Sequence, residues 1–74
     1  MNIEVRLFAT LRHGRSPRQS IELPAGSRLA DVPDQLNIGR HEVFIRLRNG
    51  CAAEWETVLS DGDTVSLFPA IGGG

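Results

Sequence analysis

The chain has 74 residues, of which 41% are hydrophobic and 23% charged, and its net charge is −1 at pH 7. This length allows one domain with a single thin core, which excludes a large internal substrate cavity. The near-neutral charge argues against a general nucleic-acid binder, and no apolar run is long enough to span a membrane or to act as a secretory signal. We therefore expect a cytoplasmic protein with neither nucleic-acid nor membrane partners.

The first part of the chain predicts two antiparallel strands joined by a basic loop. Between Asn2 and Phe8, apolar and polar residues alternate with the period of two that is typical of a strand with one buried face. Residues 9–19 carry three arginines around a glycine and a proline, and this loop is either solvated or meets an acidic partner. Residues 20–23 are β-permissive and should return antiparallel to the first strand.

A single helix is expected after the break at residues 24–26. Three apolar residues recur with the spacing of an inner helix face: Leu29, Val32 and Leu36. Ser27 would be the N-cap of a helix kinked at Pro33; alternatively, the helix begins late, with Asp31 as N-cap and Pro33 in its first turn. We favour the late or irregular start, because a proline inside a helix costs about 3 kcal/mol. Residues 37–39 should end the helix.

The second half predicts a hairpin. The segment from Val43 to Arg48 alternates, with Val43, Ile45 and Leu47 on one face, and the following Asn49-Gly50 is the strongest short signal for a turn. A brief strand at residues 51–53 would complete the hairpin. Cys51 is the only cysteine, which excludes an internal disulfide, and beside two alanines we expect it to be partly buried and unreactive.

The last strand is expected at residues 64–68, with Val65 and Leu67 facing inward. Residues 55–59 before it could form a short turn of helix over the core, and residues 60–63 a tight turn. The first and last strands are both strongly apolar, so we expect them to lie centrally and to pair in parallel. Six residues are predicted to form the core: Val5, Leu7, Leu36, Ile45, Val65 and Leu67.

The chain closes on Gly72, Gly73 and Gly74. Glycine lacks Cβ, so such an end could enter a narrow channel and present its terminal carboxylate as a reacting group. The alternative is a frayed end without a role. All eight basic residues are arginine; this reflects composition bias or, less simply, a need to keep amines away from an activated carboxylate. His13 and His41 lie far apart in sequence, so we expect no metal and no cofactor.

Three stretches carry a resemblance to a known family: residues 7–12, residues 43–50, and residues 59–69 together with the terminal glycine pair. They resemble the ubiquitin-like β-grasp sulfur carriers, most closely the small subunit of molybdopterin synthase and more distantly the sulfur carrier of the thiamine pathway. The chain departs from that pattern in Pro69-Ala70-Ile71, where the family commonly has two prolines and a valine, and at Pro33, where it has an apolar helix residue. The fit to a partner's channel could therefore differ.

The resemblance implies an α+β, β-grasp fold. One helix would pack on a mixed four- to five-stranded sheet over residues 1–68, and residues 69–74 would form a flexible extended tail. It further implies that the protein is a sulfur carrier rather than an enzyme, that Gly74 is the reacting residue, and that a docking set surrounds it. The implied docking residues are Phe8, Arg12, Phe68, Pro69, Ile71, Gly72 and Gly73; the two phenylalanines could equally lie in the core.

The resemblance also implies three partners. An ATP-dependent adenylating enzyme would activate the carboxylate of Gly74, a persulfide enzyme would supply sulfur, and the large subunit of a molybdopterin-synthase-like complex would receive the thiocarboxylate. Two other functions stay open: a protein modifier that is joined to lysines, and a β-grasp interaction module without activation chemistry.

Overall fold

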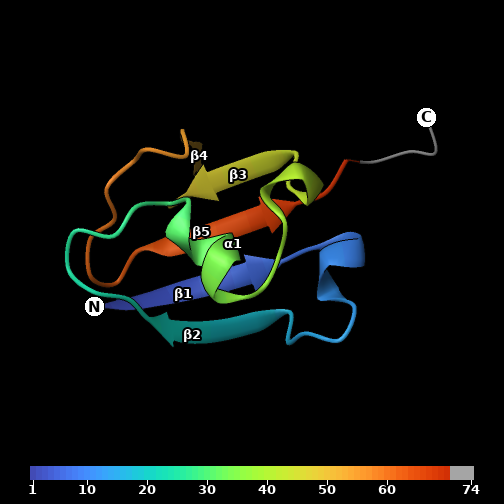
Figure 1. The fold of residues 1–74 in the computed structure, drawn as a ribbon, viewed down its shortest axis with the longest axis horizontal. Coiled ribbons are helices and arrows are strands. Elements are labelled where there is room, and N and C mark those ends of the chain that lie inside the picture. Colours follow the sequence, from blue (N-terminus) through green and yellow to red (C-terminus); the bar gives the residue numbers. More distant parts are fainter. Residues whose placement is uncertain (71–74) are drawn as a thin grey trace.

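The computed structural model describes residues 1–70, which form a five-stranded mixed sheet with one short helix on one face (Figure 1). The strand order is β2-β1-β5-β3-β4. The central strands, β1 (Asn2–Leu7) and β5 (Thr64–Phe68), pair in parallel, as their apolar composition predicts. Strands buried along the middle of a sheet need apolar side chains, which these two strands supply at alternate positions.

The outer strands of the sheet are β2 on one side of the central pair and β3 and β4 on the other. Strand β2 (Arg18–Glu22) returns antiparallel to β1, beginning at Arg18 rather than at Ser20. Strands β3 (Ile45–Arg48) and β4 (Cys51–Ala52) form the predicted hairpin. Its turn residues, Asn49 and Gly50, have φ of 51° and 84°, the left-handed conformation that Asn-Gly tolerates best.

The late helix start is confirmed, with a correction to its cap. Helix α1 (Asp31–Gln35) has Pro33 in its first turn, where a missing N–H costs nothing. Ala30, rather than Ser27 or Asp31, is the N-cap. The carboxylate of Asp31 instead accepts a hydrogen bond of 2.8 Å from the backbone N–H of Arg28. Asn37, at φ 58°, turns the chain out of the helix.

The core lies between the inner face of the sheet and α1 with its flanking segments. Its fully or nearly buried apolar residues are Ile3, Val5, Leu7, Leu11, Ile21, Leu23, Leu29, Val32, Ile38, Val43, Leu59, Val65 and Leu67. Four of the six predicted core residues are therefore buried. Leu36 packs against the core while partly exposed, and Ile45 is 40% exposed and belongs to the outer face.

Strand β3 has its faces reversed relative to the prediction. Ile45 pairs with Phe68, which points outward, whereas Arg46 pairs with the inward-facing Leu67. Directly opposed residues share a face, so the apolar alternation of β3 lies outside and its arginines lie inside. The inward Arg46 lies 4.6 Å from the ring centre of Trp55. Val43 is buried, but it precedes the strand and does not set its phase.

Two smaller predictions in the following segment are wrong. Residues 55–59 form no helix; they make a turn and an isolated antiparallel bridge between Arg28 and Val58, while the partly exposed Trp55 packs on the core. Cys51 is exposed, on the edge strand β4. Two 3-10 helices, η1 (Ala9–Arg12) and η2 (Arg40–Glu42), complete the elements.

The mixed sheet and helix α1 together make the β-grasp arrangement that the resemblance implies.

Candidate functional site

The two central strands end side by side, and this brings Phe8 and Phe68 together. Their rings stack with centroids 4.2 Å apart and planes within 8° of parallel. The N–H of Phe8 donates to the carbonyl of Leu67, 3.2 Å away, which continues the parallel ladder past β1. Both phenylalanines are half-buried and lie outside the core, so the alternative of core burial is wrong. A stacked, partly exposed pair offers an apolar contact surface.

Arg12 lies beside this pair at the end of η1. Its Nε donates to the carbonyl of Leu7 at 3.2 Å, and its guanidinium carbon is 6.0 Å from the ring centre of Phe8. The short helix exists because Ala9, at φ 53°, turns the chain sharply after β1. The fold therefore places three of the predicted docking residues in one cluster: Phe8, Arg12 and Phe68.

The sheet register adds two residues that the sequence interpretation placed on the inner face. Ile45 stands opposite Phe68 and Leu47 opposite Ser66, all on the outer face. We call Phe8, Phe68, Ile45 and Leu47 the apolar strip. No local signal distinguishes the two faces of β3, because its alternation fits either one; only the register with β5 decides.

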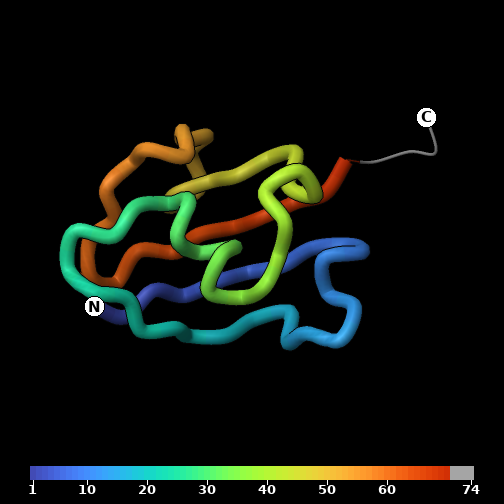
Figure 2. The backbone as a smooth tube through the Cα atoms, viewed as in Figure 1, coloured from blue at the N-terminus to red at the C-terminus, as the bar shows by residue number. Residues whose placement is uncertain are grey.

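The tail begins at this cluster. Pro69, a predicted docking residue, is buried, and Ala70 is exposed. The remaining predicted site residues, Ile71, Gly72, Gly73 and Gly74, lie outside the described residues. Figure 2 shows that the loop after β1 and the segment after α1 reach the same end of the sheet, where β5 ends. Arg15 links these two segments through a hydrogen bond of 3.3 Å to the carbonyl of Asn37.

The opposite end of the sheet is closed by Asp63. Its carboxylate accepts hydrogen bonds from the Ser60 N–H and from the side chains of Arg48 and Asn49, at 2.8 to 2.9 Å. Burial opposes ionisation, yet these three donors hold the pKa of Asp63 below its usual value. The aspartate thus does more than form a turn: it ties the β3–β4 turn to the start of β5.

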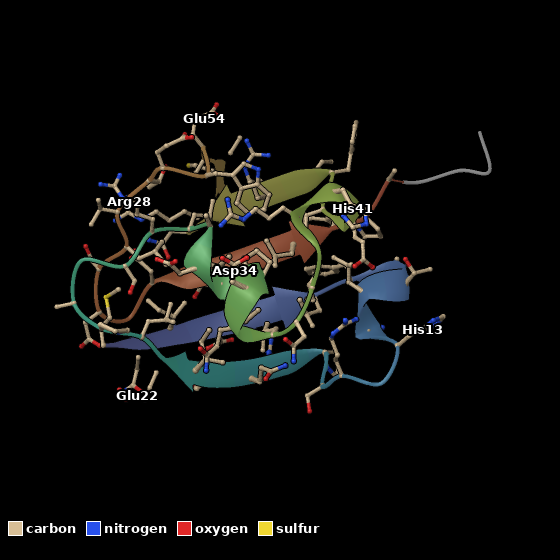
Figure 3. The ribbon with its side chains drawn as sticks, viewed as in Figure 1. His13, Glu22, Arg28, Asp34, His41 and Glu54 are labelled. Carbon is tan, nitrogen blue, oxygen red and sulfur yellow. The ribbon has the colours of Figure 1, made fainter. Side chains whose placement is uncertain are left out.

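Side chains that commonly bind metals are dispersed over the described residues. No group of three or more histidine, cysteine or carboxylate side chains gathers anywhere in residues 1–70. His13 and His41 come from separate segments (Figure 3). Within the same range, no helix has the length and hydropathy that crossing a bilayer requires.

A mixed five-stranded sheet with parallel central strands and one helix across it defines a ubiquitin-like β-grasp protein. The family model described as the ThiS family matches residues 5–74, and the chain belongs to that family.

Similar proteins agree with this assignment. The chain is 29% identical, over 86 residues, to the molybdopterin synthase sulfur carrier subunit of Mycobacterium tuberculosis (strain ATCC 25618 / H37Rv), with 100% of this chain and 99% of that protein covered. The crystal structure of SAMP1 from Haloferax volcanii is similar with a TM-score of 0.82 at 25% identity, and all of both chains is covered. A chain in the complex of subunits 1 and 2 of the molybdopterin-converting factor from Helicobacter pylori 26695 is similar with a TM-score of 0.70 at 25% identity, again over the whole of both chains. The family and these relatives support a sulfur-carrier role.

Proposed function

We propose that this protein carries sulfur on its C-terminus as a thiocarboxylate of Gly74 and delivers it for molybdopterin synthesis. Membership of the ThiS family is the observation that carries the proposal. The M. tuberculosis relative, a molybdopterin synthase sulfur carrier subunit, supports the choice of pathway.

The chemistry needs activation first, because a carboxylate is a poor electrophile. An ATP-dependent adenylating enzyme joins the carboxylate of Gly74 to AMP and releases pyrophosphate. The terminal sulfur of an enzyme persulfide then attacks the carbonyl carbon and AMP leaves. A thiol then attacks the resulting S–S bond at the sulfur of the persulfide enzyme. This releases the thiocarboxylate on the present chain and forms a disulfide between the thiol and the persulfide enzyme.

The carrier contributes reach and docking rather than acid–base groups. Residues 69–74, if extended at up to about 3.5 Å each, span roughly 20 Å, enough to enter a partner's buried site. The apolar strip and Arg12 lie where this tail starts, so a partner that receives the tail also covers them. By analogy with the H. pylori complex, we propose that one such partner is the large subunit of a molybdopterin-synthase-like complex.

Intact mass of the protein recovered from its native host tests the proposal. We expect a fraction whose mass has increased by the exchange of one oxygen for sulfur, and loss of that fraction when the adenylating enzyme is removed. Species joined to lysines of other proteins, in place of the sulfur form, would indicate a protein modifier. If neither form is found, the interaction module without activation chemistry takes its place.

Deletion of Gly74 separates fold from chemistry. The new terminal carbonyl lies up to about 3.5 Å short of the attacking sulfur, and a misplacement of 1 Å can cost about 100-fold in rate. Thiocarboxylate formation by the cognate enzymes should therefore fail, while the melting temperature stays the same. Because Gly73 could partly replace Gly74 if the tail slides deeper, Gly73→Ala in the full-length chain is the companion variant. The carrier proposal is wrong if both variants are adenylated and thiolated at the parent's rate.

A further inference from the structure

A basic groove lies beside the apolar strip, on the half of the sheet formed by β1 and β2. It has a volume of about 440 Å³ and is lined by Arg6, Leu7, Phe8, Arg12, Pro17 and Arg18. Arg6 and Arg18 stand directly opposite each other in the β1–β2 pair, so both side chains leave the same outer face. Two guanidinium groups placed directly opposite each other repel, and a nearby negative charge reduces this repulsion.

The groove holds too few carboxylates for its arginines. Glu4 is the only acidic partner within residues 1–70: its Oε2 lies 3.1 Å from Nε of Arg6 and 3.5 Å from Nε of Arg18. Arg12 hydrogen-bonds to a backbone carbonyl instead of a carboxylate. Two of the three guanidinium groups, those of Arg6 and Arg18, therefore share one carboxylate, while the third bonds to a backbone carbonyl.

Three of the other five arginines in the described chain have a carboxylate of their own, whereas Arg15 and Arg28 hydrogen-bond to backbone carbonyls. Arg40, Arg46 and Arg48 each pair with their own carboxylate at 2.8 to 3.2 Å. In addition, residues 5–21 contain four arginines and no acidic residue, although the whole chain has a net charge of −1. Positive charge is thus concentrated in this segment, while the rest of the chain, with four arginines and nine carboxylates, has a net charge of −5.

The position of the groove indicates when it is used. Phe8 belongs both to the groove and to the stacked pair at the start of the tail. A protein that receives the tail must approach this end of the sheet, and a groove next to that contact is covered in the same complex. Phe8 and the exposed Pro17 provide apolar walls between the charges.

We infer that this groove binds an acidic segment of the partner protein that receives the tail. At least two carboxylates of the segment meet Arg6, Arg12 and Arg18, and an apolar side chain of the segment lies against Phe8 and Pro17. The inference rests on the proposed function for the identity of the partner, and on the groove alone for the chemistry of the segment. Charges at the edge of an interface mainly set the association rate and the choice of partner.

The test uses the full-length, ¹⁵N-labelled protein and a hexaglutamate peptide. At low salt, adding the peptide should change the amide chemical shifts of Arg6, Phe8 and Arg18 and leave that of Arg28 unchanged. Arg28 lies at the opposite end of the molecule from His13, which belongs to the loop between β1 and β2 (Figure 3). High salt should abolish the binding, because exposed charges are screened within about 3 Å at 1 M. A hexalysine peptide is the control for the sign of the charge.

Variants locate the binding. The double variant Arg6→Gln, Arg18→Gln should weaken hexaglutamate binding about fourfold to twenty-fivefold, given about twofold to fivefold for each exposed charge pair. Arg28→Gln, the matched control, should leave it unchanged, and both proteins should keep the parent's melting temperature. The inference is overturned if the double variant binds like the parent, if no shifts occur at low salt, or if hexathymidylate binds the groove more tightly than hexaglutamate. Thiocarboxylate formation is measured separately. If hexaglutamate binds the groove but no thiocarboxylate forms, only the proposed function is contradicted. If the thiocarboxylate forms but hexaglutamate does not bind, only the inference about the groove is contradicted.

Discussion

The two ends of the sheet differ in whether their polar groups have partners within the protein. At the end closed by Asp63, every oxygen of a buried carboxylate has a donor, and the backbone of Asn2 is tied to Asp61 by a hydrogen bond of 2.7 Å. At the end where the tail starts, stacked aromatic rings are partly exposed and arginines outnumber carboxylates. Satisfied polar groups fix a structure, whereas exposed apolar surface and unbalanced charge gain free energy only when a partner covers them. The first end therefore maintains the fold, and the second is suited to docking.

The largest effect on stability should come from the core that joins the two ends. Leu67 is fully buried, whereas Ile45, one strand away on the outer face, is 40% exposed. Leu67→Ala should lower the free energy of unfolding by about 2 to 5 kcal/mol. Ile45→Ala should cost clearly less, about 1 kcal/mol, because the site creates no internal cavity. Urea denaturation of both variants checks this; equal losses would return Ile45 to the core.

Asp63→Asn should have the next largest effect. An amide cannot accept from all the donors that the carboxylate satisfies, so the variant should lose about 1 to 3 kcal/mol at neutral pH. Because the folded pKa of Asp63 lies below its unfolded value, this stabilisation is complete above about pH 4 and disappears as the pH falls through the folded pKa. The difference between variant and parent, measured by denaturation at several pH values, should therefore shrink in acid. A difference that stays constant with pH would mean that the carboxylate's charge does not matter.

Arg12→Ala should have a smaller effect, limited to docking. Arg12 is exposed, with one hydrogen bond to the Leu7 carbonyl and a contact to the face of Phe8, so the melting temperature should barely change. Association with the adenylating enzyme should slow by about twofold to fivefold at low salt and match the parent at high salt. Stopped-flow association at two salt concentrations measures this, with Arg28→Ala as the control. A loss that is the same at both concentrations would assign Arg12 a role other than charge.

The smallest effect is expected at the exposed pair Asp34–Arg40. Hydrogen bonding to Arg40 lowers the pKa of Asp34, but both side chains are half exposed to solvent. Arg40→Gln should leave stability nearly unchanged at every pH from 3 to 7, because an exposed ion pair contributes little. Denaturation of this variant beside Asp63→Asn compares a solvated ion pair with a buried one, and a comparable loss in both would contradict that contrast.

Much of the fold follows from the sequence, because its signals are local or strongly periodic. The alternation in residues 2–8 and 64–68 sets which side chains are buried in the two central strands, and their apolar content favours a central, parallel pair. Asn49-Gly50 has the conformation that its composition predicts, and Pro33 forces the late helix start. The role of Gly74 in sulfur transfer is inferred from the sequence and the family, and it stays a prediction.

Tertiary structure alone decided which way β3 faces. Its alternation of apolar residues and arginines is compatible with either orientation, since inward arginines are acceptable once Trp55 and Asp63 cover them. The register with β5 selects the orientation that places Ile45 beside Phe68 and so completes the apolar strip. The basic groove likewise cannot be predicted from the sequence, because Arg6 and Arg18 become neighbours only when β1 and β2 pair. Local residues determine how each segment folds, whereas the faces that a partner would meet are set by long-range pairing.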